Sequence, residues 1–293
     1  MKRLLLIINP VAGRNQVQAD LFKIVKVFSD EGYEVTVYPT RAPLDCAEKV
    51  RQDAGSYDIV CCCGGDGTLN EMVSGMMQRT ERVPMGYIPL GSTNDLAASL
   101  HIPLKVEEAA RHCVSGTPFY MDVGSLNDRY FNYVAAFGAF TEASYATPQQ
   151  IKNALGHLAY ILEGAKSLGH LQPIHMKIST ESEVLEEDYL FGAVTNTVSL
   201  GGVLKLDPKK VLLDDGMYEL LLVKNPANPL EAQAMLGALM MQNYEGEQVR
   251  LLHASRIRFE SDHEVSWTID GEYGGSTHDA LIVNNKNAVT LMV

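Results

Sequence analysis

Short apolar runs alternate with stretches of mixed polarity through the first 120 residues. The apolar runs include LLLII and DIVCCC, which have the length and aliphatic content of buried strands, and the stretches between them have the texture of surface helices. The predicted strands are 4–8, 35–38, 58–63 and 85–90, and the predicted helices are 16–30, 43–53, 68–79, 95–100 and 105–114. This βαβ rhythm predicts a parallel sheet covered by helices, with ligand loops at the carboxyl ends of its strands.

From about Thr117 the pattern changes to that of β-hairpins. The strand-like segments FYMDVGSL and RYFNYVAAF flank Asn127-Asp128, which is a typical turn dipeptide. Further strands are predicted at 174–180, 188–196, 217–223, 255–260, 264–269 and 280–283. We therefore expect a mixed α/β protein of two domains: an α/β nucleotide-binding domain with a parallel sheet at residues 1–121, and a mainly-β sandwich at residues 122–293.

Two helical stretches, 149–168 and 229–241, interrupt the second half. The first has an apolar face and the second is apolar nearly all round, so core packing is the simplest interpretation of both. The alternative is that one of them borders an acyl chain or contacts a membrane surface, because Met235, Met240 and Met241 form an adaptable apolar group.

Composition narrows the classes of partner. The chain of 293 residues has 36 acidic against 24 basic residues, a formal charge of −12, which argues against nucleic acid as a partner. The five cysteines, three of them consecutive at 61–63, do not have the spacing of a disulfide framework, so a reducing cytoplasm is expected. No apolar run approaches the roughly 20 residues of a transmembrane helix, so any membrane contact is expected to be peripheral.

The loop after the third predicted strand has the strongest chemical signal. A buried strand at 58–63 leads into Gly64-Gly65-Asp66-Gly67-Thr68 and directly into a helix. Glycines permit unusual backbone conformations and a close approach of phosphate to N–H groups, and the helix start adds a favourable dipole. The alternative for this loop alone is a tight glycine turn.

Three other polar loops follow the neighbouring strands. Asn9–Gly13 follows the first strand, Pro39-Thr40 ends the second, and Gly91–Asp95 follows the fourth. The carboxyl ends of parallel strands meet at one edge of a sheet, so the four loops together predict a nucleotide site. The spacing matches neither a Walker A loop nor the dinucleotide fingerprint.

The ordered set NPVAG, GGDGTLNE, PLGSTNDLA, LLDDG and IDGE resembles the diacylglycerol kinase catalytic-domain family, particularly its bacterial soluble lipid kinases, over essentially the whole chain. The resemblance implies transfer of the γ-phosphoryl group of ATP, with Mg²⁺, to a hydroxyl of a lipid such as diacylglycerol. GGDGT is shared with NAD kinases, so an NAD-kinase-like phosphotransferase is one alternative. A catalytically inactive nucleotide-binding regulator is another.

The resemblance also implies roles for individual residues. Those expected around ATP are Asn9, Pro10, Gly13, Thr40, Gly64, Gly65, Asp66, Gly67, Thr68, Asn70, Glu71, Ser92, Thr93 and Asn94. Asp66 is also expected to act in catalysis, beside the phosphates and Mg²⁺, where a carboxylate makes electrostatic sense. Its alternative role is to cap the helix predicted to begin at Thr68. Many relatives have Thr where this chain has Ser92, a change that keeps the hydroxyl.

The remaining expected site residues lie in the second half, except Asp122 at its boundary. The resemblance implies a Mg²⁺ site at Asp215 with the backbone carbonyls of Leu212 and Met217, and Asp122 is expected to join its carboxylate network. The alternative for Asp215-Gly216 is a simple turn between strands.

A base must take the proton of the acceptor hydroxyl, and the resemblance assigns this neighbourhood to Asp270 and Glu272 without choosing between them. Relatives often have Pro where Tyr273 follows here. Loop carboxylates contribute little core packing, so replacing Asp66 or Asp270 by alanine is expected to leave the fold intact.

Overall fold

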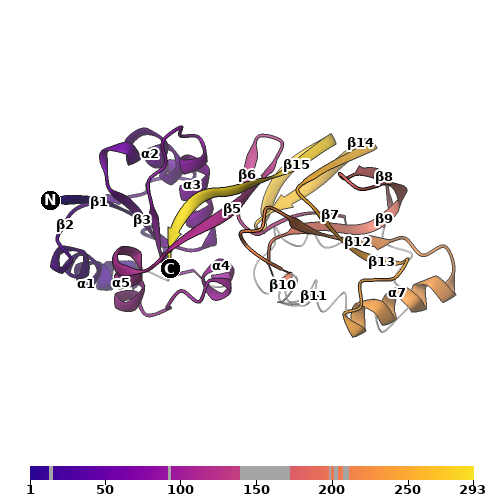
Figure 1. Cartoon of the computed structure of the whole chain (residues 1–293), viewed down its shortest axis with the longest axis horizontal. Coiled ribbons are helices and arrows are strands. Elements are labelled where there is room, and N and C mark those ends of the chain that lie inside the picture. Colours follow the sequence, from indigo (N-terminus) through magenta and orange to yellow (C-terminus); the bar gives the residue numbers. More distant parts are fainter. Residues whose placement is uncertain (13–15, 92–93, 139–171, 198, 201–203, 207–210) are drawn as a thin grey trace. The chain divides into compact units, whose positions relative to one another are not determined.

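The chain forms two compact units, which the computed structural model describes at residues 1–12, 16–91, 94–138, 172–197, 199–200, 204–206 and 211–293 (Figure 1). The first unit comprises residues 1–123 and 286–293, and the second comprises residues 124–285. Two domains and a mixed α/β content are therefore confirmed. The division differs from the expected boundaries at the carboxyl end, because the last strand returns to the first unit.

The first unit is built on parallel strands. β1 (Lys2–Ile8) pairs in parallel with β2 (Tyr33–Pro39) and with β3 (Ile59–Gly64), and β3 pairs in parallel with β4 (Met85–Pro89). The end of β15 (Glu272–Met292) adds a parallel contact to β4 at Leu291. Leu4 to Ile7 and Cys61 to Cys63 are fully buried, which explains the continuous apolar runs in the sequence.

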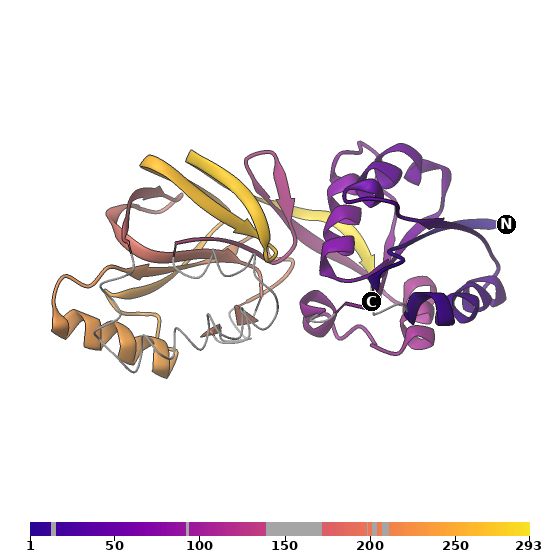
Figure 2. The same cartoon turned by 180° about the vertical axis from the view of Figure 1, so that it is seen from behind.

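Helices cover both faces of this sheet. They are α1 (Gln16–Asp30), α2 (Asp45–Asp53), the 3₁₀ turn η2 (Ala54–Ser56), α3 (Asp66–Met77), α4 (Asp95–Ser99) and α5 (Val106–Ser115). α2 packs beside α3 on one face, and α1 packs beside α5 on the other (Figures 1 and 2). Cys61 and Cys63 belong to the core under α1 and α5, whereas Cys62 points to the opposite face, as strand alternation predicts. The cysteines therefore form no metal cluster in the described part of the chain.

The second unit is mainly antiparallel. Its strands are β5 (Pro118–Leu126), β6 (Arg129–Phe131), β7 (Val134–Gly138), β8 (Ile174–Ser179), β9 (Val184–Thr195), β10 (Ser199–Leu200), β11 (Leu204–Lys205), β12 (Tyr218–Lys224), β13 (Val249–Ala254), β14 (Arg256–Ile269) and β15, and β5 and β15 each extend into the first unit. Neighbouring strands follow the order β13-β12-β9-β7-β14-β15. The strands predicted separately at 255–260 and 264–269 form the single strand β14, whose register shifts between Glu260 and Val265.

One core of this unit is aromatic. Phe137, Phe259 and Trp267 pack with ring centroids 5.0–5.7 Å apart, a geometry that favours edge contacts. The predicted helix at 229–241 is observed as α7 (Pro229–Met241), with Met235 and Leu239 buried and Met240 and Met241 exposed. The predicted helix at 149–168 lies outside the described residues. Among the described residues, no helix is long and apolar enough to span a membrane.

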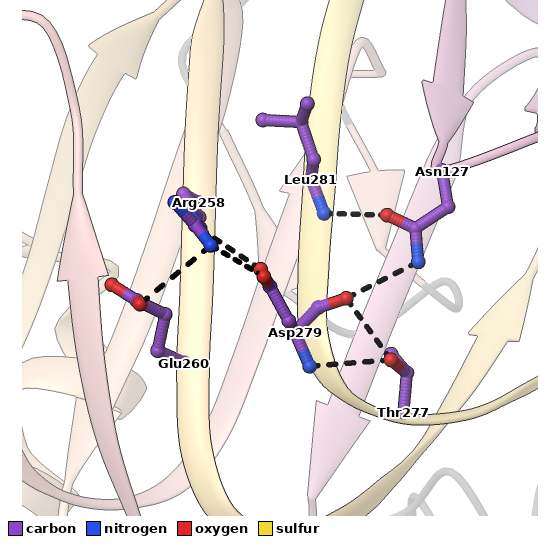
Figure 3. Close-up of polar contacts among 6 residues, drawn as sticks. All are labelled: Asn127, Arg258, Glu260, Thr277, Asp279 and Leu281. Atoms are coloured by element: carbon purple, nitrogen blue, oxygen red, sulfur yellow. Dashed lines mark hydrogen bonds and ion pairs between the residues drawn. The ribbon is translucent and has the colours of Figure 1, made fainter.

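Polar contacts fix the β5–β6 turn to the β14–β15 hairpin (Figure 3). Asn127, in the predicted turn, has a left-handed backbone (φ 51°), and its Oδ1 accepts from Leu281 N at 2.8 Å. Arg258 Nε donates to Asp279 Oδ1 at 2.9 Å on the exposed side. Asn127 therefore both forms the turn and ties it to β15.

Candidate functional site

The loops that follow the parallel strands start at one edge of the sheet in the first unit. Asn9 N donates to Cys63 O at 3.0 Å, Thr40 N donates to Ile8 O at 2.8 Å, and Leu90 N donates to Gly64 O at 2.7 Å. Each bond joins the end of one strand to the end of its neighbour. The sheet itself therefore sets the starting points of the four loops.

The glycine loop after β3 and the loop after β4 touch through their backbones. A Cβ atom added to Gly91 would lie 2.7 Å from Gly65 Cα, and one added to Gly65 would lie 3.2 Å from Gly91 Cα. A Cβ atom on Gly64 would clash with the Thr68 hydroxyl. None of the three has a positive φ, so close packing explains these glycines, and the expected unusual backbone conformation does not.

Two asparagines shape these loops from within. Asn94 is 8% exposed, and its Oδ1 accepts from Gly91 N at 2.8 Å while its Nδ2 donates to Gly91 O at 3.0 Å. Asn9 Nδ2 donates to Thr68 Oγ1 at 3.3 Å, and Asn9 Oδ1 accepts from Val11 N at 3.1 Å. Both asparagine side chains are thus engaged within the loops. Backbone N–H groups of the loops could then bind a phosphate.

Asp66 is the first residue of α3, so the helix begins two residues earlier than predicted. Gly65 occupies the N-cap position and has no side chain with which to cap the helix. Asp66 therefore lies in the first turn, where the helix dipole favours a carboxylate, and Gly65 instead of Asp66 is the N-cap residue. Asn70, one turn further on, accepts from Ser74 Oγ at 3.5 Å.

The Glu71 carboxylate binds the amino end of α2. Its Oε1 accepts from Leu44 N at 2.8 Å and its Oε2 from Cys46 N at 3.2 Å, at the start of α2. Pro10 lies in the turn after β1, and Gly67 is exposed at the start of α3. Gly13, Ser92 and Thr93 lie outside the described residues.

Asp122 is fully buried in the first unit. Its Oδ1 accepts from Asn287 N at 2.7 Å, which ties β5 to the left-handed turn (φ 50°) in β15. The structure gives this carboxylate a structural contact, and its part in a metal network stays a prediction.

The Asp215 turn precedes β12 in the second unit. Asp215 Oδ1 accepts from Met217 N at 2.8 Å, Gly216 has a left-handed φ of 86°, and Met217 O accepts from Asn284 Nδ2 at 3.2 Å. A carboxylate and backbone carbonyls from one short segment are hard oxygen donors of the kind that Mg²⁺ prefers, with water completing the shell. The described residues contain no group of three or more His, Cys, Asp or Glu side chains that could hold a metal. The carbonyls of Leu212, which is half-exposed, and Met217 stay predicted as the further oxygen donors.

The Asp270–Glu272 turn separates the two candidate bases. Asp270, at φ 48°, accepts three backbone N–H groups: Asn132 N at 2.8 Å on Oδ2, and Tyr133 N and Val134 N at 3.0 Å each on Oδ1. Asp270 N also donates to Val134 O at 2.9 Å. The carboxylate of the exposed Glu272 makes no hydrogen bond or ion pair within the part of the chain that the structure describes. These contacts favour a structural role for Asp270, so whether the fold is intact without this carboxylate stays a prediction to be tested.

Sequence reasoning missed Glu219 on β12. This carboxyl is 1% exposed, lies opposite Thr195 and His253, and its Oε1 is 3.8 Å from His253 Nε2. Burial, with a smaller contribution from the charge of Asp215, raises the pKa of Glu219 to about 8. A charged residue between Tyr218 and Leu220 was the only signal in the sequence, and strand alternation alone does not separate it from a solvent-facing residue.

Two family models together match most of the chain. Residues 3–126 match the diacylglycerol kinase catalytic domain, and residues 135–291 match the YegS C-terminal NAD kinase beta sandwich-like domain. The chain is 33% identical to a diacylglycerol kinase of Bacillus subtilis (strain 168), over 94% of this chain and 91% of that one. It is 32% identical to a diacylglycerol kinase of Staphylococcus saprophyticus, over 94% and 90% of the two chains.

A solved structure has the same fold. It is a provisionally assigned diacylglycerol kinase from Bacillus anthracis str. Sterne, with a TM-score of 0.81 and 25% identity, and the match covers 99% of this chain and 97% of that one. The resemblance in the sequence motifs is therefore confirmed. The chain belongs to the diacylglycerol kinase family of lipid kinases.

Proposed function

We propose that this protein transfers the γ-phosphoryl group of ATP, with Mg²⁺, to a hydroxyl of a lipid, with diacylglycerol as the first candidate acceptor. Membership of the family supports the reaction class, and the named relatives are diacylglycerol kinases. The single observation that carries the mechanism is the contrast within the Asp270–Glu272 turn, where one carboxylate is used structurally and the other is exposed.

The first unit is proposed to hold ATP. Phosphates fit the amino end of α3 and the backbone N–H groups of the loops at the sheet edge, because these donors and the helix dipole favour negative charge. The contact between Gly65 and Gly91 keeps the two loops at a fixed spacing. This gives an acidic chain a local anion site that needs no basic patch.

The second unit is proposed to supply the base and the metal site. Glu272 takes the proton of the acceptor hydroxyl as that oxygen attacks the γ-phosphorus, and the bond from that phosphorus to the bridging oxygen of ADP breaks. Asp270 positions Glu272 by fixing the turn. Asp215 and the carbonyls of Leu212 and Met217 would hold Mg²⁺, which when bound supplies positive charge.

The test is transfer of labelled γ-phosphate by the purified chain to a panel of acceptors, with and without Mg²⁺. The panel contains diacylglycerol, phosphatidylglycerol, a sphingoid base and ceramide, each in mixed micelles, together with NAD. We expect a labelled lipid only with Mg²⁺, and diacylglycerol as the best acceptor.

NAD belongs in the panel because the matching C-terminal domain is described as NAD kinase beta sandwich-like. Labelled NAD without labelled lipid would overturn the proposal in favour of an NAD-kinase-like enzyme. ATP binding without transfer to any acceptor would overturn it in favour of a nucleotide-binding regulator.

A further inference from the structure

Glu71 links α2 and α3, the helices that follow the loops after β2 and β3 in the proposed nucleotide site. It lies on α3, one turn after Thr68, and its two carboxylate oxygens accept from Leu44 N and Cys46 N at 2.8 and 3.2 Å. The amino end of α2 has no side-chain cap of its own. A carboxylate from α3 therefore satisfies two backbone donors of α2 and complements the dipole of that helix.

Leu44 has an unfavourable conformation that needs such support. Its φ of 68° is left-handed, a region that leucine adopts at a cost because its Cβ crowds the backbone. The side chain is 69% exposed, so packing contributes little to holding it there. The backbone of Leu44 is held by the N–H bond to Glu71 and by its carbonyl, which accepts from Glu48 N at 3.1 Å.

The supported segment continues from Thr40. Arg41 N donates to Asp45 Oδ2 at 2.8 Å, and Tyr38 OH donates to Asp45 Oδ1 at 2.9 Å. The segment lines an open pocket of about 520 Å³ formed by Arg41, Ala42, Pro43, Leu44, Asp45 and Glu48. Releasing Leu44 would therefore move the wall of a pocket directly beside an expected nucleotide contact.

We infer that Glu71 is a positioning residue: it locks the 41–45 segment onto α3 and so sets the affinity for ATP without touching the nucleotide. The inference rests on the proposed nucleotide site and replaces the expected direct contact of Glu71 with ATP. Both oxygens already accept N–H groups of the α2 end, and a carboxylate with no cation between it and a phosphate would repel that phosphate.

The test compares Glu71→Ala with Glu71→Gln, and uses Glu34→Ala, an exposed carboxylate on β2 of the same unit, as the control. Two hydrogen bonds to a charged acceptor are lost in Glu71→Ala, so we expect KM for ATP to rise about 10- to 100-fold with kcat changed less than about threefold. Hydrogen exchange at the amides of Leu44 and Cys46 should accelerate by a similar factor. Glu71→Gln should show a smaller change, and Glu34→Ala none.

A second variant, Leu44→Gly, tests the backbone strain at Leu44 directly. Glycine adopts φ 68° without strain, so adding Leu44→Gly to Glu71→Ala should recover part of the lost ATP affinity. If Glu71→Ala does not fold, Glu71→Gln carries the same comparison.

A fall in kcat with unchanged KM and unchanged exchange at both amides would overturn the inference, because Glu71 would then act on the reacting groups. The exchange measurement needs no turnover. Failure of the lipid kinase assay with faster exchange in Glu71→Ala would therefore contradict the proposed function alone.

Discussion

The glycine-loop edge of the first unit and the Asp270–Glu272 turn of the second unit fix their geometry in different ways. At the sheet edge, loops that follow adjacent strands touch directly through Gly65 and Gly91. At the turn, one carboxylate binds three N–H groups that are 136 to 138 residues away along the chain. The first arrangement follows from short sequence motifs, whereas the second depends on contacts between residues far apart in the chain.

Glu272→Gln gives the largest expected effect and tests the reactive half of the turn. Removing a general base lowers kcat by about 10²- to 10⁴-fold, and the exposed side chain contributes little to stability. The measurements are steady-state phosphoryl transfer and the midpoint of thermal unfolding. Glu264→Gln, an exposed carboxylate on β14, is the matched control and should change neither. Activity within threefold of the wild type would place the base elsewhere.

Asp270→Ala tests the structural half of the same turn. Three backbone N–H groups lose a charged acceptor, so we expect the free energy of unfolding to fall by about 3 kcal/mol. Urea denaturation measures the change, with Asp262→Ala, an exposed residue of β14, as the control. An unchanged midpoint together with lost activity would instead make Asp270 the reacting carboxylate.

Gly91→Ala tests the backbone contact at the sheet edge. The new Cβ would lie 2.6 Å from Asn94 Oδ1 and 2.7 Å from Gly65 Cα, so the two loops must shift at a cost of about 1–3 kcal/mol, and ATP binding should weaken. Gly237→Ala on α7 is the control, because nothing lies within 4 Å of its added Cβ. That helical substitution should stabilise the protein by about 0.5–1 kcal/mol. A Gly91→Ala variant as stable as the wild type, with normal ATP affinity, would refute the packing argument.

The last prediction, Glu219→Gln, concerns the pH dependence of stability and not ATP binding or phosphoryl transfer. The pKa of Glu219 is about 8 in the folded chain against an ordinary value of 4.5, so between these values the folded state keeps a proton that the unfolded state loses. Stability should therefore fall as pH rises through this window, by about 1 kcal/mol per pH unit from this group.

Glu219→Gln should flatten this slope and raise the unfolding midpoint most at pH 8. Thermal unfolding of both proteins at pH 5, 6.5 and 8 without Mg²⁺ measures the pH dependence of stability. An identical slope in both proteins would show that Glu219 remains ionised in the fold.

The two units also differ in how much of their structure the sequence predicts. The elements of the first unit follow from apolar periodicity, and the loops at its sheet edge follow from strand polarity, since parallel strands end together. The roles of individual side chains do not follow from the motifs. Glu71 lies within GGDGTLNE, yet its carboxylate binds the amino end of α2, and nothing near Glu71 in the sequence marks Leu44 as its partner.

In the second unit, the contacts between residues far apart in the chain cannot be predicted from the sequence pattern. Asp270 and Glu272 are equivalent candidates in the motif, and only the position of residues 132–134 separates them. The same limit applies to Glu219, whose burial depends on the strands on either side of β12. Hairpins were predictable from turn residues such as Asn127, because their partners are close in the chain.

We propose that the two units have separate roles: the loops of the first unit hold ATP, and the Glu272 carboxylate acts in phosphoryl transfer. Calorimetric titration of ATP with Mg²⁺ into the wild type, Gly91→Ala and Glu272→Gln tests it most directly. The account predicts weaker binding by Gly91→Ala, by about tenfold, and unchanged binding by Glu272→Gln despite its loss of activity. Equal loss of ATP affinity in both variants, or full affinity in Gly91→Ala, would contradict it.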